Sequence, residues 1–252
     1  SFDGFNIHRA YSPGAKENTH VYCIINADSL LYLGTDAGVL VYNTKTDRYR
    51  SLNVKFPADV RALLMENSTL WIGSLNGLYK FDTKTKRISQ VAKGIAHKAV
   101  YALEMAADGS VFVGTYNGLS RKRPGSDSFE RVAIGQRGGG RNFFVNSLVA
   151  DDSDDCLWVG TEGALYVYDI YSGGIGEVTS MSGNSIKSLA IDTEGNLIIG
   201  TDDGLYVRNY NGHIDRYCHD SRAKGSLSSN VVWAVMTDNN GNVWLGTEYD
   251  VS

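Results

Sequence analysis

The chain is poor in proline and cysteine and has no long apolar run. Only 3 of its 252 residues are proline and 3 are cysteine. The cysteines, Cys23, Cys156 and Cys218, show no C-x-x-C spacing, so we predict small buried thiols, with a Cys156 to Cys218 disulfide as the alternative. No apolar run approaches the roughly 20 residues that span a bilayer, and the first residues lack a signal-peptide pattern. We therefore expect a soluble fragment that reaches a membrane only through its parent chain.

Excess positive charge and the usual catalytic signatures are also missing. The formal net charge of −4 provides no basic footprint, so we expect no contact with nucleic acid. The sequence holds no H-E-x-x-H, G-x-x-x-x-G-K-[ST] or G-x-S-x-G motif, and its 5 histidines are scattered without ligand spacing. These absences predict no catalytic residue, no metal and no cofactor. We interpret the acidic run from Asp151 to Asp155 as a hairpin turn, with a calcium site as the alternative.

Glycine, by contrast, is abundant, and part of it follows a repeat. Some of the 28 glycines follow an apolar triplet and precede threonine or serine. They recur at intervals of about 40 to 46 residues and are Gly34, Gly73, Gly114, Gly160, Gly200 and Gly246. A period of this length, built from short apolar runs, predicts an all-β propeller in which each repeat is one four-stranded blade. We expect this glycine to end the second strand of each blade, before a tight turn into the third strand.

The repeats account for about six blades, five of them complete. The sixth is divided between the two ends of the chain, because its first two strands come last and residues 2–7 resemble a fourth strand. This division predicts one propeller domain over residues 1–252, closed by its own ends or forming part of a larger ring. Trp71, Trp158 and Trp244 share one position, two residues before the repeat glycine, so we expect all three to be buried between blades.

Two stretches carry a family pattern. Asp192 to Tyr206 and Asp238 to Thr247 resemble the two-component-regulator propeller repeat. This resemblance implies the periplasmic sensor region of a hybrid two-component system of Bacteroides-type bacteria, which recognises oligosaccharides on behalf of a histidine kinase. It also implies a seven-bladed ring, from which the six blades counted here depart. We further expect the parent protein to act as a homodimer.

We expect recognition on the face formed by the turns between second and third strands and by the loops that enter each first strand. These segments leave the sheet at the same end of every blade and can vary without disturbing the core. Aromatic rings beside carboxylates and amides suit a polyhydroxylated ligand. Solvated turns are the simpler interpretation of each candidate. The candidate ligand-binding residues are Tyr116, Asn117, Glu162, Asp202, Glu248, Tyr249, Arg141 and Asn142.

One loop on this face, from Gly135 to Phe144, combines glycines with two arginines and two phenylalanines. We interpret it as a segment that closes over a ligand or docks a partner, with a linker as the alternative. Two other functional classes stay open: a protein-interaction scaffold and a carbohydrate-active enzyme. The enzyme would need two paired carboxylates, one with a raised pKa, and the candidates for such a pair are Glu162, Asp202 and Glu248.

Overall fold

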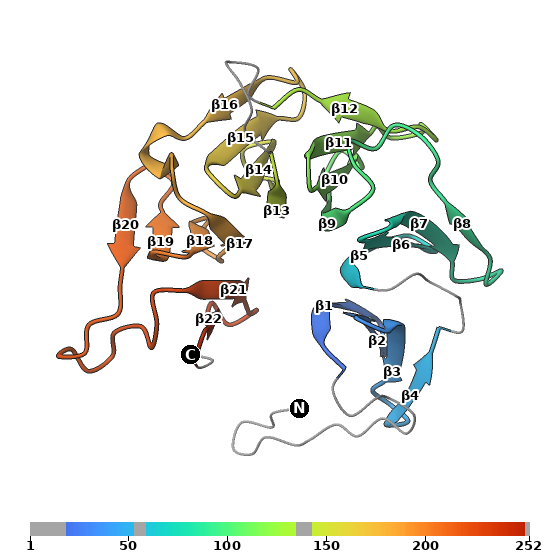
Figure 1. Ribbon diagram of the computed structural model, residues 1–252, viewed down its shortest axis with the longest axis horizontal. Coiled ribbons are helices and arrows are strands. Elements are labelled where there is room, and N and C mark those ends of the chain that lie inside the picture. The colour runs from blue at the N-terminus through green and yellow to red at the C-terminus, as the bar shows by residue number, and fades with distance from the viewer. Residues whose placement is uncertain (1–18, 53–58, 135–142, 250–252) are drawn as a thin grey trace.

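The computed structural model describes residues 19–52, 59–134 and 143–249. Over these residues the chain forms five four-stranded antiparallel sheets and one two-stranded sheet. The sheets stand side by side around a common centre and together make an open arc (Figure 1). This arrangement confirms the predicted all-β propeller. Each sheet is called a blade below, and the blades are numbered in chain order.

The four strands of each complete blade pair in chain order, and the first strand lies innermost (Figure 1). Blade 1 contains β1 (Val21–Ala27), β2 (Leu30–Thr35), β3 (Gly38–Asn43) and β4 (Arg48–Ser51). Blade 2 contains β5 (Val60–Glu66), β6 (Thr69–Ser74), β7 (Gly77–Asp82) and β8 (Ile88–Gln90). Blade 3 contains β9 (Val100–Met105), β10 (Val111–Thr115), β11 (Gly118–Lys122) and β12 (Glu130–Val132).

The second half of the arc continues this order. Blade 4 contains β13 (Val145–Asp151), β14 (Cys156–Thr161), β15 (Leu165–Asp169) and β16 (Ile175–Glu177), followed by the 3-10 helix η1 (Thr179–Met181). Blade 5 contains β17 (Ile186–Ile191), β18 (Leu197–Thr201), β19 (Gly204–Arg208) and β20 (Ile214–Tyr217). Blade 6 contains β21 (Val232–Thr237) and β22 (Val243–Thr247). The segment 2–7, predicted to supply the fourth strand of the sixth blade, lies outside the described residues.

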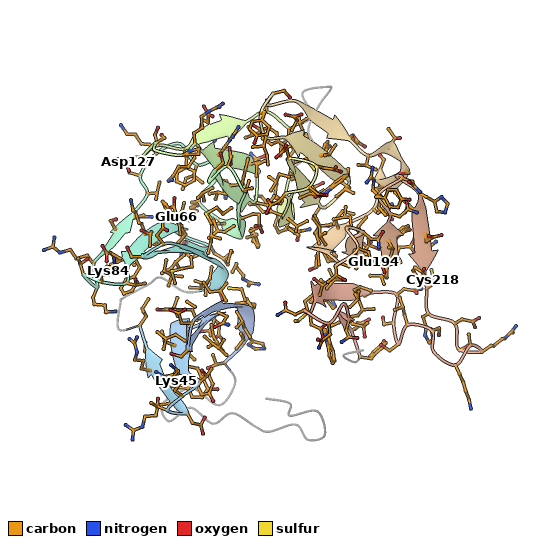
Figure 2. All side chains as sticks on the ribbon, turned by 180° about the vertical axis from the view of Figure 1, so that it is seen from behind. Lys45, Glu66, Lys84, Asp127, Glu194 and Cys218 are labelled. Atoms are coloured by element: carbon orange, nitrogen blue, oxygen red, sulfur yellow. The ribbon has the colours of Figure 1, made fainter. Side chains whose placement is uncertain are left out.

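The hydrophobic core is divided into layers, one at each boundary between neighbouring blades. Between blades 3 and 4, for example, Phe112 packs in one cluster with Leu157 and Val159. Side chains fill the space between neighbouring sheets, whereas Lys45 and Lys84 extend outwards at the outer edge (Figure 2). Each layer needs a blade on both sides, so a single repeat cannot bury its apolar faces alone.

The repeat glycine does not end the second strand, and the prediction from sequence is wrong on this point. In blade 3 the strand continues through Gly114 to Thr115. A Cβ atom on Gly114 would lie 2.6 Å from Cγ1 of Val145, which is the first residue of the first strand of the next blade. The glycine is therefore needed where the neighbouring blade makes its closest approach.

Two of the three repeat tryptophans are buried as predicted. Trp71 is 2% exposed and Trp158 is 3% exposed, but Trp244 is 37% exposed. Trp244 belongs to blade 6, at one end of the arc, where the described residues provide no following blade to cover it (Figure 1). The prediction of equal burial is wrong for Trp244, because burial at this position depends on the neighbouring blade.

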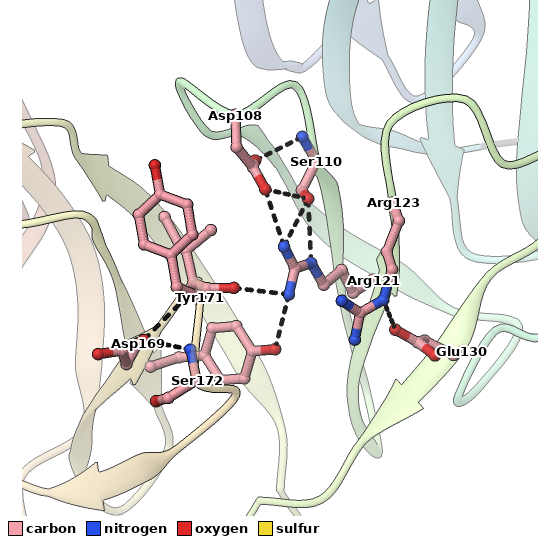
Figure 3. A network of polar contacts seen from close by, with 10 residues as sticks. Asp108, Ser110, Arg121, Arg123, Glu130, Asp169, Tyr171 and Ser172 are labelled. Carbon is pink, nitrogen blue, oxygen red and sulfur yellow. Dashed lines mark hydrogen bonds and ion pairs between the residues drawn. The ribbon is translucent and has the colours of Figure 1, made fainter.

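A buried arginine joins blades 3 and 4 (Figure 3). Arg121, on β11, donates hydrogen bonds to the carbonyl oxygen of Ile170 at 2.8 Å and to the hydroxyl of Tyr168 at 3.2 Å, both in blade 4. The same guanidinium pairs with Asp108 Oδ2 at 2.8 Å and donates to Ser110 Oγ at 2.8 Å within blade 3. Its charge and its donors are thus satisfied from both blades, which fixes how the two blades sit against each other.

The three cysteines are free thiols, so the alternative of a Cys156 to Cys218 disulfide is wrong. Cys156 is buried, whereas Cys23 and Cys218 are half-buried. Burial raises the pKa of the Cys23 and Cys156 thiols to about 12. Both side chains therefore stay protonated at neutral pH and behave as small apolar groups.

Candidate ligand-binding face

The first strand of every described blade begins with a β-bulge. The pairing register shifts just after the first paired residue of the strand, so that one extra residue has no partner on the second strand. A bulge redirects the side chain that it carries. The extra residues, called the bulge arc below, are Tyr22, Arg61, Tyr101, Asn146, Lys187 and Trp233.

The bulge arc surrounds the centre of the molecule at one end of the blades. First strands are innermost, so their first residues lie around the central axis (Figure 1). The residue before the bulge is fully buried in blades 2 to 6, as Val60 and Val232 illustrate at 0% exposed. The bulge residues themselves are partly exposed, up to 56% for Trp233. One residue therefore anchors the strand in the core while the next presents its side chain to solvent.

The turns between second and third strands lie at this same end of the blades. Val21, the residue before the first bulge, pairs with Thr35, which opens the turn. Thr35 Oγ1 donates to the carbonyl oxygen of Gly38 at 2.9 Å and accepts from the Ala37 N–H at 3.1 Å. Equivalent bonds recur in the other four-stranded blades. The turns and the entering loops are also hydrogen-bonded to each other, so the face predicted from the sequence exists.

An aromatic cluster occupies this face between blades 3 and 4. The ring of Tyr116 lies 5.5 Å from that of His97 and 5.4 Å from that of Phe144, measured between centroids. Phe144 in turn lies 4.4 Å from Tyr101 of the bulge arc. Tyr116 is 42% exposed, so the cluster offers an aromatic surface to solvent. Of the predicted residues, Tyr116 thus lies against two entering loops and is linked to the bulge arc through Phe144.

Glu162 belongs to a second cluster, between blades 4 and 5. Its carboxylate accepts hydrogen bonds from the Ser185 hydroxyl at 2.5 Å and from Lys187 Nζ at 3.4 Å. Lys187 also lies 5.4 Å from the ring centre of Trp233. Burial raises the pKa of Glu162, but Ser185 and Lys187 outweigh burial and hold this pKa below its ordinary value. A carboxylate that stays ionised can accept from ligand hydroxyls, whereas a glycosidase acid needs a raised pKa.

The third cluster lies between blades 1 and 2. The guanidinium carbon of Arg61 lies 3.7 Å from the ring centre of Tyr22, whose hydroxyl donates to Asp59 Oδ1 at 3.5 Å. In the turn of blade 1, Asp36 Oδ2 lies 3.6 Å from His20 Nδ1. Arg61 Nε and Asp36 Oδ1 are both buried and, within the described residues, have no hydrogen-bond partner.

The other predicted residues do not join these clusters. Asn117 lines a hollow of about 250 Å³ together with Arg131, which belongs to the outermost strand of blade 3. Three candidates are exposed and, within the described residues, donate or accept no side-chain hydrogen bond with the clusters: Asp202, Glu248 and Tyr249. Two candidates and most of the glycine-rich loop lie outside the described residues: Arg141, Asn142 and 135–142.

Sequence reasoning missed the bulge arc. The repeat glycines mark the second strand of each blade, whereas the bulge residues follow the first apolar residue of each first strand. The signal is a large polar or aromatic side chain between that apolar residue and a small one, as in Val60-Arg61-Ala62 and Val100-Tyr101-Ala102. Side chains of a regular strand alternate between the two faces of the sheet, so this position looks ordinary in the sequence. Only the pairing register of the first and second strands shows that a bulge is present.

The acidic run at Asp151 to Asp155 is the turn between β13 and β14. Asp151 Oδ1 accepts a hydrogen bond from the Ser153 N–H at 3.1 Å, and Oδ2 accepts from the indole N–H of Trp158 at 3.4 Å. Over the residues that the structure describes, no group of three or more histidine, cysteine or acidic side chains is placed to hold a metal ion. The Asp151 carboxylate shapes the hairpin and supports the buried tryptophan.

The fold and this face define a β-propeller with a candidate recognition surface at one end of its central axis. Residues 226–249, which contain β21 and β22, match the family model described as the two component regulator propeller. The match includes the stretch from Asp238 to Thr247 on which the resemblance was based. The resemblance to two-component-regulator propeller repeats is thereby confirmed.

Similar solved structures are extracellular domains of bacterial signalling systems. Two crystal structures of the extracellular domain of BT4673 from B. thetaiotaomicron, called a one component system in one and a hybrid two component system in the other, are 39% identical to this chain. Their TM-scores are 0.92 and 0.91, and the likeness covers 100% of this chain and 34% of theirs. The extracellular domain of the hybrid two component system BT3049 from the same organism has a TM-score of 0.77 at 19% identity, over 94% of this chain and 33% of that one, which shows the fold alone.

A curated relative is the histidine kinase P4 of Formosa agariphila, which is 29% identical in an alignment of 156 positions that covers 56% of this chain and 11% of that protein. The chain thus spans about a third of the solved domains and about a tenth of this kinase. The extracellular position of the solved domains agrees with the predicted periplasmic location, and their membership of signalling systems agrees with a sensor propeller that is not itself an enzyme. Within the described residues, no helix has the length and apolar character needed to cross a membrane.

Proposed function

We propose that this chain is part of the ligand-sensing propeller of a hybrid two-component system and that its ligand is an oligosaccharide. The observation that carries the proposal is the presence, at the same end of the blades, of the aromatic cluster of Tyr101, Tyr116 and Phe144 and of the polar side chains of Asn146 and Glu162. Aromatic rings stack on the C–H faces of sugars, while ionised carboxylates and amides bond their hydroxyl groups. The likeness to the BT4673 extracellular domain supports the signalling role.

The proposal includes a single propeller domain over residues 1–252. At the boundary between neighbouring blades, the repeat glycine of one blade packs against the first residue of the next. The two ends of the arc carry one half of this contact each. Gly246, on β22, has no side chain of a following blade beside it within the described residues. Val21, on β1, is 46% exposed, whereas its counterpart Val60 is fully buried. The same contact can therefore continue across the opening, directly or through a further blade.

Sensing requires more than binding. A ligand that binds two arrangements of a sensor with equal affinity shifts no equilibrium, however tightly it binds. We propose that the parent protein is a homodimer and that a ligand on this face favours one arrangement of the dimer.

Isothermal titration calorimetry with a panel of oligosaccharides, on the natural protein that contains this chain, tests the binding role. Tyr101→Ala and Trp233→Ala should each weaken binding about 2- to 10-fold, since each removes a ring from the face. Tyr171→Ala is the matched control, because Tyr171 is 71% exposed but follows β15 at the opposite end of blade 4. If no oligosaccharide binds, or if all three variants bind like the wild type, the proposal is wrong.

The same samples test the alternative of a carbohydrate-active enzyme. We expect no product to be released from any glycan of the panel, because the pKa of Glu162 is lowered rather than raised. Product release that disappears in Glu162→Gln would establish an enzyme instead.

A further inference from the structure

The loop of residues 91–99, which connects β8 to β9, borders two hollows at the end of the blades that carries the candidate face. The larger hollow, of about 350 Å³, is lined by Lys93, His97 and Lys98 of this loop. The smaller hollow, of about 250 Å³, is lined by the same loop and by Arg131 on β12. Lys93, Lys98 and Arg131 are together called the cationic rim below.

The cationic rim is not neutralised within the described protein. Neither Lys93 nor Lys98 forms an ion pair or a hydrogen bond there, and both residues are exposed. Arg131 donates to a backbone carbonyl oxygen at 2.5 Å but pairs with no described carboxylate. Its neighbour in the chain, Glu130, is already paired with Arg123 at 2.8 Å. Among the described residues, no aspartate or glutamate lines either hollow, so the rim has cations without counter-ions.

This concentration of one charge sign differs from the rest of the face and of the chain. In the other clusters of the face, Lys187 pairs with Glu162 at 3.4 Å, and Arg61 lies with two carboxylates. The chain as a whole has a formal net charge of −4. Residues 135–142, which lie outside the described residues, contain no acidic residue in their sequence. A concave surface lined by one charge sign focuses its potential, so these hollows favour an anion.

The aromatic cluster of the face adjoins both hollows. His97 lines the larger hollow, and its ring centroid lies 5.5 Å from that of Tyr116. His97 Nδ1 accepts a hydrogen bond from the Ala99 N–H at 3.1 Å, which leaves Nε2 of the neutral ring as a donor. Asn117, which follows Tyr116 in the chain, lines the smaller hollow. The ring on which a sugar would stack is therefore linked to a cationic hollow by its contact with His97.

We propose that the oligosaccharide recognised on this face is acidic, and that its carboxylate or sulfate group binds the cationic rim while a sugar ring stacks on Tyr116. This inference rests on the proposed function and specifies the chemical class of its ligand. Ammonium and guanidinium groups are donors only, so the rim can satisfy the oxygens of an anion but cannot accept from sugar hydroxyl groups. Hydrogen bonds between two charged groups are also stronger than those between neutral groups.

Calorimetry on the natural protein that contains this chain tests the inference with two matched pairs of probes. One pair is a galacturonate oligosaccharide and its methyl ester, and the other is a sulfated disaccharide and its desulfated form. We expect one acidic probe to bind about 10-fold more tightly than its uncharged counterpart, in line with a hydrogen bond to a charged group. The pair that shows this preference identifies carboxylate or sulfate as the group recognised. The preference should shrink as salt concentration rises, because the rim is exposed.

Charge-removing variants locate the preference. Lys93→Gln combined with Lys98→Gln should lower it about 3- to 10-fold and leave the melting temperature unchanged, because neither side chain is bonded within the described protein. Arg131→Gln should also lower it, and Arg131→Lys, which keeps the charge but loses the planar fork, should lower it less. The matched control combines Lys45→Gln with Lys84→Gln, which removes two charges from the outer edge and should change nothing (Figure 2).

A variant of the aromatic ring separates stacking from charge recognition. Tyr116→Ala should weaken the acidic and the uncharged probes alike, about 2- to 10-fold, and leave their ratio unchanged. A loss confined to the acidic probes would overturn the assigned division between ring and rim.

The outcomes also separate this inference from the proposed function. Equal binding of acidic and uncharged probes, or a preference that survives intact in the Lys93/Lys98 and Arg131 variants, would overturn the acidic ligand and leave the oligosaccharide sensor standing. Binding by uncharged oligosaccharides of the panel alone would do the same. Absence of binding by every probe and by the whole panel would overturn both.

Discussion

A Cβ atom on Gly73 would lie 2.5 Å from Cγ1 of Val100, across the boundary between blades 2 and 3. The same approach recurs between Gly34 and Val60, where the distance would be 2.8 Å. The repeat glycine and the first residue of the next blade are therefore two halves of one contact. This contact, rather than a turn, explains the glycine in the first five repeats.

Replacing Gly73 by alanine should destabilise the protein by about 1 to 3 kcal/mol, because the new methyl group overlaps Val100 in a packed core. Gly163→Ala is the matched control, since a Cβ there would meet nothing within 4 Å. Urea denaturation midpoints of the two variants check the prediction. Equal midpoints would show that the blades can separate at this contact without cost.

Trp158→Ala should lower the free energy of unfolding by about 3 to 5 kcal/mol, because this ring is 3% exposed and fills the layer between blades 4 and 5. Tyr210→Ala, at a tyrosine that is 80% exposed, should stay within about 0.5 kcal/mol of the wild type. Thermal and chemical denaturation measure both. A small effect at Trp158 would mean that the layer between these blades is loosely packed.

Arg121→Met should cost about 3 to 5 kcal/mol, because it leaves Asp108, whose side chain is 18% exposed, without its charge partner and removes the bonds to blade 4. The neighbouring Arg123 forms an ion pair of the same length, 2.8 Å, with Glu130 (Figure 3). The side chains of both residues are more than half exposed. Arg123→Met should therefore cost less than about 1 kcal/mol. If both variants lost a similar amount of unfolding free energy, burial would not be what makes the ion pair of Arg121 strong.

Glu104 makes stability depend on pH. Burial raises its pKa to about 7, and Asp152 adds to the effect, whereas the Met105 N–H opposes it. The pKa of this side chain is 4.5 in the absence of such effects, so the folded state binds more protons between pH 4.5 and about 7. Stability should consequently fall as pH rises through that window.

Glu104→Gln should remove this dependence. The variant should match the wild type near pH 4, where the carboxyl is protonated in both states, and exceed it near pH 8 by up to about 3 kcal/mol. Urea denaturation at several pH values provides the measurement, with Glu130→Gln on the surface as the control. A constant difference between Glu104→Gln and the wild type at all pH values would contradict the shifted pKa.

The candidate site was only partly predictable from the sequence. The sequence places Tyr116 and Glu162 in turns at one end of the blades, and the structure agrees, because turns follow the strand pattern directly. The contacts of Tyr116 with Phe144 and of Glu162 with Lys187 join different blades, and no local pattern specifies them. Arg61 was missed because a bulge exists only when two strands pair out of step.

The sequence by itself determined the class of fold, the order of the strands and the position of each blade. This was possible because each blade is built from short consecutive strands that pair with their neighbours in the chain. Only the tertiary structure decided what each repeated position does. Trp71 and Trp244 occupy the same position in their repeats, yet they are 2% and 37% exposed. Burial and the pairing of charges depend on the adjacent blade, and the residues that supply it come from another repeat of the chain.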